Sequence, residues 1–535
     1  MISALLIIIL LWIGIFFNKA GYYLYLWQVK EYRFRRFLAE LKEPGGFAII
    51  INRGFAITAL LLIGVIVFPL WPLFYSVTLL YFLEFLLLSW RLIAGQSKLP
   101  VFTVKSLLLF LLSFGIPFLG LVYVPFGTPR DRLIYLLIAD IAAPLIVTFF
   151  VILLKPFTYL AKQYIVAQAK ARRRAFRNLT AIGISGSVGK TSTKEFLAHI
   201  LGTKFKVAKT REHQNTEIGA ARALLGMRRG TEVFVAEMGA YHKGDIKEIS
   251  DVVKPAIGII TSLGYEHLAL FGSLEATIET ELELAYILPS DGTLIVNWDN
   301  EYIKKALQDK PPKPRVLTYS THDKSADLYA SDIKEGLETL SFTMHYKGKS
   351  EHLEVQLLGK HNVSNILAAA MAGLHLGMKL KDIASAASTL ESLAHTMKFY
   401  HGIGQMVIID DSYNASMEAV KAGFAHAKRY KERTRVVIMP SLIELGDKAQ
   451  DFHKEIGKAA GEIFDFAFIT DKKYESAFIA GWKEGGGDAT HLFFRSDPTL
   501  LAKTLEQIVD EKTLILIEGR VPRAIASMLL HHFYV

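Results

Sequence analysis

Hydrophobic and polar positions divide this chain into two parts with different patterns. Up to residue 155, long runs of apolar side chains are separated by short polar segments. From residue 178 onward, short apolar runs alternate with segments in which apolar positions recur at helical spacing. The first pattern predicts an all-α transmembrane bundle, because about 20 apolar residues are needed to cross the core of a bilayer. The second predicts strands alternating with helices, and hence mainly parallel sheets covered by helices.

Four apolar stretches predict about five membrane-spanning helices. The stretches cover residues 2–17, 55–90, 106–124 and 133–154. The second is too long for one span and is interrupted by Pro69 and Pro72, so we expect two short spans joined at these prolines. A signal peptide is disfavoured for the first stretch, because its start carries no basic side chain and no small-residue cleavage site follows.

Membrane topology explains the net charge of +10 better than nucleic-acid binding does. Basic residues accumulate in three segments that lie on one predicted side of the membrane, whereas the other side has Arg130 and Arg132. Since Lys and Arg accumulate on the cytoplasmic side, we expect an outside N-terminus and a cytoplasmic C-terminal half. The three segments contain Lys19, Lys30, Arg33, Arg35, Arg36, Lys42 and Arg53; Arg91, Lys98 and Lys105; and Lys155, Lys162, Lys170, Arg172, Arg173, Arg174 and Arg177.

Three features near the predicted spans each allow two interpretations. Residues 22–41 mix aromatic, aliphatic and basic side chains, which fits an amphipathic helix on the inner membrane interface or a cytoplasmic helix packed on the soluble half. Glu84 and Asp140 are acids within predicted spans; they line a polar path, contact a headgroup or serve helix packing. Residues 169–177 are a basic linker that acts as a tether and topology signal or binds anionic lipid.

The strongest motif is residues 182–195, Ile-Gly-Ile-Ser-Gly-Ser-Val-Gly-Lys-Thr-Ser-Thr-Lys-Glu, which follows a short apolar run. Glycines let backbone N–H groups approach a polyphosphate, a helix N-terminus favours the anion, and a lysine adds positive charge. Ile184 stands where the general pattern has its first glycine, with Gly183 and Gly186 beside it. A turn without a ligand is the plain alternative, but the motif favours a nucleoside triphosphate. The predicted contacts are Gly186, Ser187, Val188, Gly189, Lys190, Thr191 and Ser192.

Polar residues at the ends of later strands extend this site. Glu237, His267 and Asn297 follow the apolar runs 231–238, 256–261 and 292–297. Ligands of parallel sheets bind beyond the carboxyl ends of the strands, so these residues predict a metal–nucleotide site. Asn362 and Asn365 share one face of a predicted helix, where they either read an adenine edge or cap the helix.

A second α/β unit follows a composition change near residues 391–404. Its strands are expected at 406–409, 435–439, 466–470 and 513–517, with Asp410 and Asp411 at the end of the first. We therefore expect a transmembrane domain (1–165), a central P-loop domain (166–394) and a C-terminal Rossmann-like domain (395–535), with the active site between the last two. The absence of cysteine excludes disulfides, thiolate metal sites and a cysteine nucleophile.

Residues 178–531 resemble the Mur ligases, and among them the type that adds D-alanyl-D-alanine to a muramoyl tripeptide. The motifs that carry the resemblance keep the order and spacing of the family. They are Ser185-Gly-Ser-Val-Gly-Lys-Thr-Ser-Thr-Lys-Glu195, Asn215-Thr-Glu-Ile-Gly219, Ala236-Glu-Met-Gly-Ala240, His267 with Phe271-Gly-Ser-Leu274, Asn297-Trp-Asp-Asn300, His361-Asn-Val-Ser-Asn365, Asp410-Asp-Ser-Tyr-Asn-Ala415 and Glu444-Leu-Gly446.

The resemblance implies a shared reaction with ATP and Mg²⁺. ATP phosphorylates an acceptor carboxylate, and an amine attacks the acyl phosphate to give an amide, ADP and phosphate. Such a reaction needs charge neutralisation and positioning more than a covalent residue. The resemblance assigns Lys190, Glu237, His267 and Glu281 to catalysis; Thr191, Glu237, His267 and Glu281 to Mg²⁺; Asn297, Asn362 and Asn365 to adenine; Asp411 to ribose; and Asn215, Tyr413, Asn414 and Glu444 to the substrate cleft.

The chain departs from the family pattern at several places. Glu281 stands where the family has a carbamylated lysine, and we expect its carboxylate to replace the carbamate. Thr396 replaces an arginine at the domain junction, with Lys398 nearby as a substitute. The Lys-Gly-Ser-Arg motif of the family is replaced by Glu518-Gly-Arg-Val-Pro-Arg523. The predicted spans take the place of the domain that binds the uridine nucleotide of the substrate.

These observations predict a multi-pass plasma-membrane ligase with cytoplasmic catalytic domains. We expect three kinds of partner: a cell-wall precursor, an amino acid or dipeptide, and membrane lipids. Because of the predicted membrane spans, the precursor can be lipid-linked. Nucleic acid is not expected as a partner. Two alternatives remain from the sequence. One is a ligase for another envelope polymer made of amino acids, and the other is a catalytically reduced nucleotide-binding scaffold at the membrane.

Overall fold

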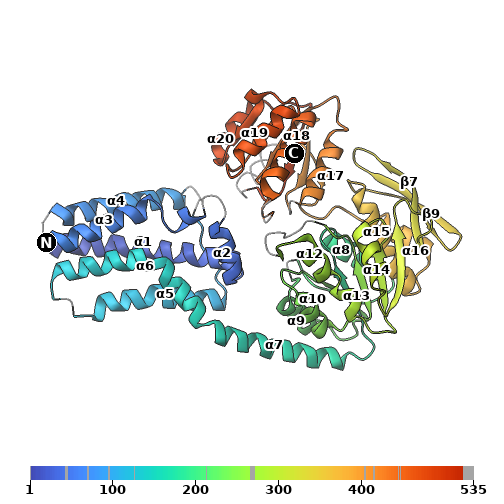
Figure 1. Ribbon diagram of the computed structural model, residues 1–535, viewed down its shortest axis with the longest axis horizontal. Helices are drawn as coiled ribbons and strands as arrows, with labels where there is room; N and C mark the ends of the chain where they lie inside the picture. Colours follow the sequence, from blue (N-terminus) through green and yellow to red (C-terminus); the bar gives the residue numbers. More distant parts are fainter. Residues whose placement is uncertain are drawn as a thin grey trace. The chain divides into compact units, whose positions relative to one another are not determined.

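The structure, a computed structural model, describes residues 2–42, 46–68, 72–93, 97–125, 127–212, 214–264, 271–402, 405–413, 416–443, 445 and 448–521. The chain forms two compact units, Met1–Gln163 and Tyr164–Val535. In Figure 1 the described part of the first unit consists of helices, and both sheets belong to the second unit.

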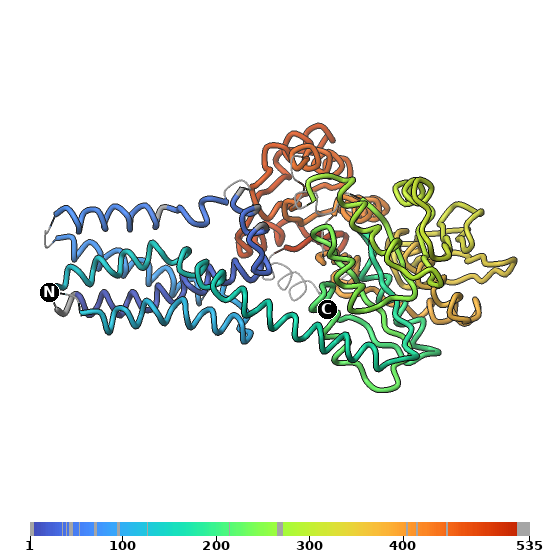
Figure 2. Tube along the Cα trace, turned by 60° about the horizontal axis from the view of Figure 1, so that its bottom comes forward, coloured from blue at the N-terminus to red at the C-terminus, as the bar shows by residue number. Residues whose placement is uncertain are grey.

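The first unit is a helical bundle built around its first helix. The elements are α1 (Ile2–Val29), α2 (Phe34–Lys42), η1 (Phe47–Ile49), α3 (Arg53–Val67), α4 (Pro72–Ile93), α5 (Val104–Tyr123) and α6 (Pro129–Leu153). α1 packs against α4, α5 and α6, and α3 packs against α4 and α6. Figure 2 shows the long helices of this unit running side by side.

Among the described residues, four helices are long and apolar enough to cross a membrane. They are Leu5–Val29, Pro72–Ile93, Val104–Tyr123 and Pro129–Leu153, and α3 is a shorter apolar helix over Gly54–Val67. The predicted pair of short spans is therefore one short helix and one full-length helix. The predicted turn at Pro69 lies outside the described residues.

α1 extends twelve residues beyond its predicted end at residue 17. Asn18 and Lys19 do not interrupt it, because the charge of Lys19 is neutralised inside the bundle. Lys19 Nζ lies 2.6 Å from Asp140 Oδ2 and 3.4 Å from Glu84 Oε2. Charges within spans are tolerated when they face the bundle and pair with each other. Lys19 thus belongs to a helix rather than to the segment between two spans.

The prediction of one amphipathic helix over residues 22–41 is wrong. Residues 22–29 complete α1, and Glu31 and Tyr32 adopt positive φ values of 54° and 58°, which turn the chain before α2 begins. The ring of Trp27 stacks on that of Phe37 with centroids 4.4 Å apart. This aromatic contact folds α2 back onto the end of α1.

The basic segment before the first sheet is helical and partly used for packing. It is the C-terminal part of α7 (Lys155–Ala175), whose Val166 and Ala169 are buried in the core of the second unit. Arg173 Nε donates to Val253 O at 2.8 Å, and Arg172 donates to Met227 O. At least these two arginines therefore attach α7 to the sheet domain.

The first sheet of the second unit has nine strands in the order β2-β3-β1-β4-β5-β6-β7-β8-β9. From β2 to β7 in this order, every pair of neighbouring strands is parallel. The pairs β7–β8 and β8–β9 are antiparallel and form a meander. The strands are β1 (Thr180–Ser185), β2 (Val207–Lys209), β3 (Val233–Glu237), β4 (Ile257–Ile260), β5 (Thr293–Asn297), β6 (Arg315–Ser320), β7 (Leu328–Glu335), β8 (Leu340–Tyr346) and β9 (Lys349–Val355).

Helices cover both faces of this sheet, as the alternating pattern predicts. Ile182 and Ile184 of β1 point into one core and Ala181 into the other, because successive side chains of a strand face opposite ways. α8 (Lys190–Gly202), α15 (His361–His375) and α16 (Leu380–Ala387) pack on the first face. The second face is covered by α9 (Glu217–Leu225), α10 (Asp245–Val253), α13 (Glu283–Ile287) and α14 (Glu301–Asp309), and α12 (Leu274–Glu281) precedes α13.

The second sheet has six strands in the order β10-β11-β15-β12-β13-β14, and all neighbours except β10 and β11 are parallel. The strands are β10 (Lys398–His401), β11 (Val407–Asp411), β12 (Thr434–Met439), β13 (Phe466–Ile469), β14 (Leu492–Phe494) and β15 (Thr513–Glu518). The other elements are α17 (Met417–Ala427), α18 (Ala449–Ile463), α19 (Glu475–Glu484), η3 (Ala489–His491) and α20 (Pro498–Glu506). Both α/β predictions are thus confirmed.

Candidate active site

The turn between β1 and α8 has the backbone of a phosphate-binding loop. Gly186 has φ +130° and Gly189 has φ +87°, a range that other residues rarely adopt. Thr261, just after β4, donates from Oγ1 to the carbonyl of Val188 at 2.7 Å. The loop is therefore fixed at the carboxyl edge of the parallel strands, where ligands of such sheets bind.

Lys190 is the first residue of α8, and its amine lies on the loop. Nζ donates to the carbonyl of Ser187 at 2.8 Å and also to that of Gly186. Thr191 and Ser192 follow in the first turn of the helix and are half-buried. A helix N-terminus with free N–H groups and a nearby ammonium group attracts anions, so this turn suits a polyphosphate.

Glu237 connects three of the predicted motifs. It ends β3, the neighbour of β1, and its carboxylate is buried. Oε2 lies 3.1 Å from Thr191 Oγ1 and 3.1 Å from Lys194 Nζ, and Oε1 accepts from Asn215 Nδ2 at 3.4 Å. The predicted metal ligand Thr191, the predicted metal ligand Glu237 and the predicted substrate contact Asn215 therefore lie together.

Lys194 is the residue that sequence reasoning missed. Its side chain is fully buried, and Nζ is also 3.3 Å from Glu195 Oε1. The sequence did contain a signal, because Thr191 and Lys194 are three residues apart on one helix and therefore share a face. A second cation on the face that carries the hydroxyl predicted to bind metal indicates an acidic partner at a neighbouring strand end.

Glu281 lies against the phosphate-binding loop. It is the last residue of α12 and is 3% exposed, and its Oε2 accepts from Gly186 N at 2.8 Å and from the hydroxyl of Ser185. The glutamates on either side lie elsewhere: Glu279 pairs with exposed Lys243, and Glu283 accepts from Gly244 N at 2.6 Å. Of these three acids, Glu281 is the one placed to act on the loop, and its role toward Mg²⁺ stays a prediction.

The three amides predicted to face adenine lie near one another through α15. Asn365 Oδ1 accepts from Thr193 at 3.4 Å, and Asn365 Nδ2 donates to Asn362 Oδ1 at 3.1 Å. Asn297, at the end of β5, donates to Ser364 at 3.3 Å. Asn362 and Asn365 lie within the first turns of the helix rather than before it, so neither is its N-cap.

The C-terminal domain contributes Tyr413 to the same region. Its hydroxyl hydrogen bonds with Thr191, and burial is the main reason that the pKa of Tyr413 is raised. The carbonyl of Tyr413 accepts from Arg520 Nε at 3.1 Å. Residues from both domains thus meet at Thr191, as a ligand bound between them requires.

Three predicted site residues, His267, Asn414 and Glu444, lie outside the described residues. In the part of the chain that the structure describes, no group of three His, Asp or Glu side chains surrounds a metal position. The hydroxyl of Thr191 and the carboxylate of Glu237 are nevertheless oxygen ligands of the kind that Mg²⁺ uses, with water and phosphate completing its shell. This donor pair fits the predicted ion.

The junction between the domains contains two strained residues. His395 and Met397 have φ values of +63° and +43°, and Thr396 between them donates from Oγ1 to Leu393 O at 3.0 Å. His395 Nδ1 is 2.8 Å from Asp410 Oδ2. Lys398 begins β10 directly after this turn.

Asp411, the predicted ribose contact, lies inside β11 and has an acidic neighbour on β15. Asp411 and Glu518 are partners in register, and Asp411 Oδ1 accepts from Met397 N at 3.1 Å. Glu518 is fully buried, and neither of its oxygens has a hydrogen-bond partner among the described residues. Burial raises the pKa of Asp411 to about 7, and burial with the charge of Asp411 raises the pKa of Glu518 well above its ordinary value.

Comparison with known proteins covers the same two domains. Sequence profiles of two families match the chain: "Mur ligase middle domain" over residues 184–373 and "Mur ligase, glutamate ligase domain" over residues 397–521. UDP-N-acetylmuramoyl-tripeptide–D-alanyl-D-alanine ligase of Bacillus subtilis is 33% identical over 301 residues, 56% of this chain and 62% of that protein. The chain thus covers about six-tenths of this relative's length.

A longer match and a solved structure give the same assignment. The protein of the same name from Synechocystis is 31% identical over 348 residues, which are 64% of this chain and 72% of that protein. The crystal structure of MurF from Acinetobacter baumannii has a similar fold, with a TM-score of 0.62 and 23% identity over 69% of this chain and 80% of that one.

The space around Gly189 predicts that Gly189→Ala weakens nucleotide binding. A Cβ at this position would lie 2.5 Å from Asn365 Oδ1, and φ would stay at +87°. We expect the affinity for ATP, measured by isothermal titration calorimetry, to fall at least about tenfold. Gly202→Ala is the control, since a Cβ there meets nothing within 4 Å and lies in the same helix. Equal affinities of the two variants would contradict the assigned loop conformation.

The Asp411–Glu518 pair predicts a pH dependence of stability. Because the folded-state pKa values of both carboxyls are raised, the folded chain keeps protons that the unfolded chain releases above about pH 4. The pair therefore makes the free energy of unfolding decrease as pH rises to 7 and above. We expect Glu518→Gln to weaken this decrease, by up to about 1.4 kcal/mol per pH unit for one retained proton.

Thermal unfolding of the full chain between about pH 5 and pH 8 measures this effect. Glu506→Gln, at an exposed position on α20, is the matched control. If both variants lose stability with pH as the unchanged chain does, the carboxyl of Glu518 does not contribute to this pH dependence.

Proposed function

Because the chain belongs to the Mur ligase family, as its motifs predicted, we propose that it is a membrane-anchored, ATP-dependent amide ligase. It joins D-alanyl-D-alanine, or a similar amino acid or dipeptide, to the carboxylate of a cell-wall precursor. The observation that carries this proposal is the meeting of Thr191, Glu237 and Tyr413, which brings the phosphate-binding loop together with the second domain.

The proposed reaction proceeds through an acyl phosphate. The acceptor carboxylate attacks the γ-phosphate of ATP, ADP leaves, and the amine then displaces phosphate from the acyl carbon to form an amide. Phosphoryl transfer is accelerated mainly by positioning and by neutralisation of charge. Mg²⁺, when bound, supplies the largest part of this neutralisation by polarising the phosphate oxygens.

Each residue of the site has a role in this proposal. The N–H groups of the loop and Lys190 bind the β- and γ-phosphates, and Thr191 and Glu237 hold Mg²⁺. Lys194 pairs with the carboxylate of Glu237 and holds it in place. Further proposed contacts are His267 and Glu281 to the metal, Asn297, Asn362 and Asn365 to adenine, Asp411 to ribose, and Asn215, Tyr413, Asn414 and Glu444 to the joined substrates.

The bundle of apolar helices supports anchoring in the plasma membrane. Four helices in the described part of the chain have the length and composition of spans, and α3 is a shorter apolar helix beside α4. Basic residues accumulate after α1, after α4 and after α6, which favours cytoplasmic catalytic domains. The bundle occupies the place of a uridine-nucleotide domain, so we propose that the acceptor is presented at the membrane as a lipid-linked precursor.

Mass spectrometry of the reaction products tests this function. The purified full chain is incubated with ATP, Mg²⁺ and D-alanyl-D-alanine, and with either a UDP-linked muramoyl tripeptide or lipid-extracted precursors. We expect one precursor to gain the mass of one dipeptide, with one ADP formed per product. Product from the lipid extract alone would identify a lipid-linked acceptor, and product from the UDP-linked substrate would argue against one. No ADP with any combination would favour a nucleotide-binding scaffold.

Glu281→Gln tests the proposed replacement of the carbamate. A neutral amide in place of the carboxylate removes one negative charge beside Gly186, so we expect Mg²⁺-dependent ATP turnover to fall roughly 100-fold. The Mg²⁺ dependence of ATP affinity is measured in parallel, because it reports on the metal without requiring turnover. Glu279→Gln, on the same helix but exposed and paired with Lys243, is the control. Unchanged turnover and unchanged Mg²⁺ dependence in Glu281→Gln would remove Glu281 from the metal site.

A further inference from the structure

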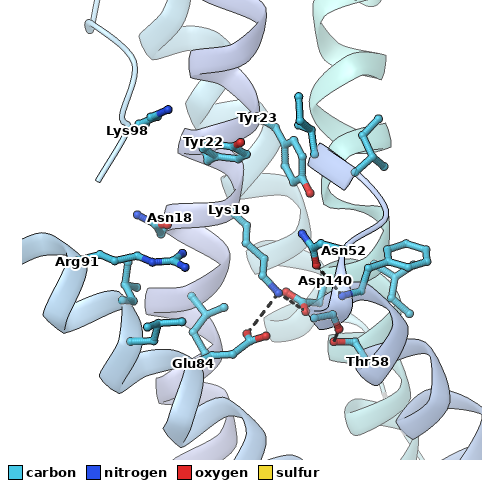
Figure 3. Close-up of a pocket in the computed structure, with 18 of the residues that line it drawn as sticks. Asn18, Lys19, Tyr22, Tyr23, Asn52, Thr58, Glu84, Arg91, Lys98 and Asp140 are labelled. Atoms are coloured by element: carbon cyan, nitrogen blue, oxygen red, sulfur yellow. Dashed lines mark hydrogen bonds and ion pairs between the residues drawn. The ribbon is translucent and has the colours of Figure 1, made fainter. Parts of the chain in front are cut away.

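The helical unit contains a cavity of its own that the ligase reaction does not use. It has a volume of about 820 Å³ and is lined by α1, α3, α4, α6, η1 and the segment after α4. A cavity of roughly 300–1,000 Å³ is typical of sites for small molecules. Figure 3 shows charged and polar side chains from separate segments of the chain pointing into it.

The inner end of the cavity is acidic. Lys19, Glu84 and Asp140 meet there, so one positive charge faces two negative charges. The side chain of Asp140 is 1% exposed, and its Oδ2 holds Lys19 at 2.6 Å. Its other oxygen, Oδ1, has no hydrogen-bond partner among the described residues. A buried acceptor without a donor is costly, so this oxygen is suited to a ligand that brings an N–H or O–H group.

The outer end of the cavity is basic. Arg91 and Lys98 line it, both are exposed, and within the described residues neither has an ion-pair partner. Arg91 lies seven residues after Glu84 on α4, about 10 Å along the helix axis. In Figure 3 its guanidinium group is turned toward Asn18 of α1. The two free cations are therefore placed to bind an anion at a distance from the carboxylates.

We propose that this cavity binds a phosphate-bearing headgroup that also carries hydroxyl or ammonium donors. The phosphate pairs with Arg91 and Lys98, and a donor of the same molecule hydrogen bonds with Oδ1 of Asp140. Asn18, Asn52 and Tyr22 also line the cavity. Phosphatidylethanolamine, phosphatidylglycerol and lipid-linked sugar phosphates have this chemistry, and so do the soluble phosphates of their headgroups.

A lipid is the expected source, given the proposed membrane anchoring on which this inference rests. Four apolar residues of the lining, Ile15, Leu87, Leu88 and Ile141, belong to helices with the composition of membrane spans. The acyl or prenyl chain of a lipid can pack against such helices. The site therefore gives the bundle a function beyond membrane attachment. It binds a phosphate-bearing headgroup, and a lipid-linked acceptor would carry a headgroup of this kind.

Native mass spectrometry of the full chain in detergent tests the site. The chain is offered phosphatidylethanolamine, phosphatidylglycerol and phosphatidylcholine with identical acyl chains; the last has a phosphate but no N–H or O–H donor. We expect the first two to be retained at least about fivefold more than phosphatidylcholine. Arg91→Gln with Lys98→Gln should lower retention of all three lipids. Asp140→Ala, which leaves Lys19 paired with Glu84, should abolish the preference for headgroups with donors.

The controls separate this site from folding and from catalysis. Arg132→Gln with Lys155→Gln removes two exposed charges of the same unit outside the cavity and should retain lipid normally. Thermal unfolding confirms that each variant is folded. Displacement of lipid by soluble phosphoethanolamine would show that the headgroup is recognised, and binding of phosphoethanolamine without lipid would identify a free phosphate as the ligand. Equal retention of all three lipids, unaffected by the Arg91 and Lys98 changes, would overturn the proposal. Lipid retention is measured without ATP turnover. A negative result would therefore contradict the lipid site without contradicting the proposed ligase activity.

Discussion

The buried carboxylate of Glu237 is the charge on which the nucleotide end of this protein depends. A carboxylate at the end of a central strand costs several kcal/mol to bury unless a partner neutralises it. Lys194 of α8 supplies the neutralising positive charge. The same ion pair fixes the position of α8 along the direction of β3. Because α8 begins with Lys190 and Thr191, one ion pair also fixes the residues that face the phosphates. Asn215 contacts the carboxylate of Glu237 and Tyr413 contacts Thr191, so two residues that we propose to contact the substrates lie beside this ion pair.

The parts of the site that depend on neighbouring residues in the chain could be predicted from the sequence. The glycine spacing, the strand before it and the helix after it predicted the phosphate-binding loop, and polar residues after apolar runs predicted the strand ends of Glu237 and Asn297. The pairing of Lys194 was missed because its partner is 43 residues away, and the spacing of Thr191 and Lys194 on one helix face does not identify the acid that they meet. The extension of α1 was missed for the same reason: a lysine after an apolar run indicates a helix end unless its counter-ions, here 65 and 121 residues away, are known.

The departures from the family pattern have different structural consequences. Glu281 accepts a hydrogen bond from the backbone of the phosphate-binding loop. The glutamate that replaces the lysine of the family pattern therefore has a partner for its buried carboxylate. Glu518 is a different case. It places a second carboxyl beside Asp411 in the interior of a parallel sheet, and Gly423 on α17 leaves room for it. The second domain therefore contains a pair of acids whose pKa values are both raised by burial, where a lysine would keep a fixed positive charge.

The ion cluster of Lys19, Glu84 and Asp140 also restricts how the helices of the first unit can slide. Packing of apolar side chains alone is similar after a shift of one turn, because leucine, isoleucine and phenylalanine recur along every helix of the bundle. A shift of about 5 Å would separate Lys19 from both acids and leave three charges unpaired in an apolar interior. The cluster thus selects one longitudinal alignment of α1, α4 and α6 from several that are otherwise close in energy, as a single polar residue does in a coiled coil.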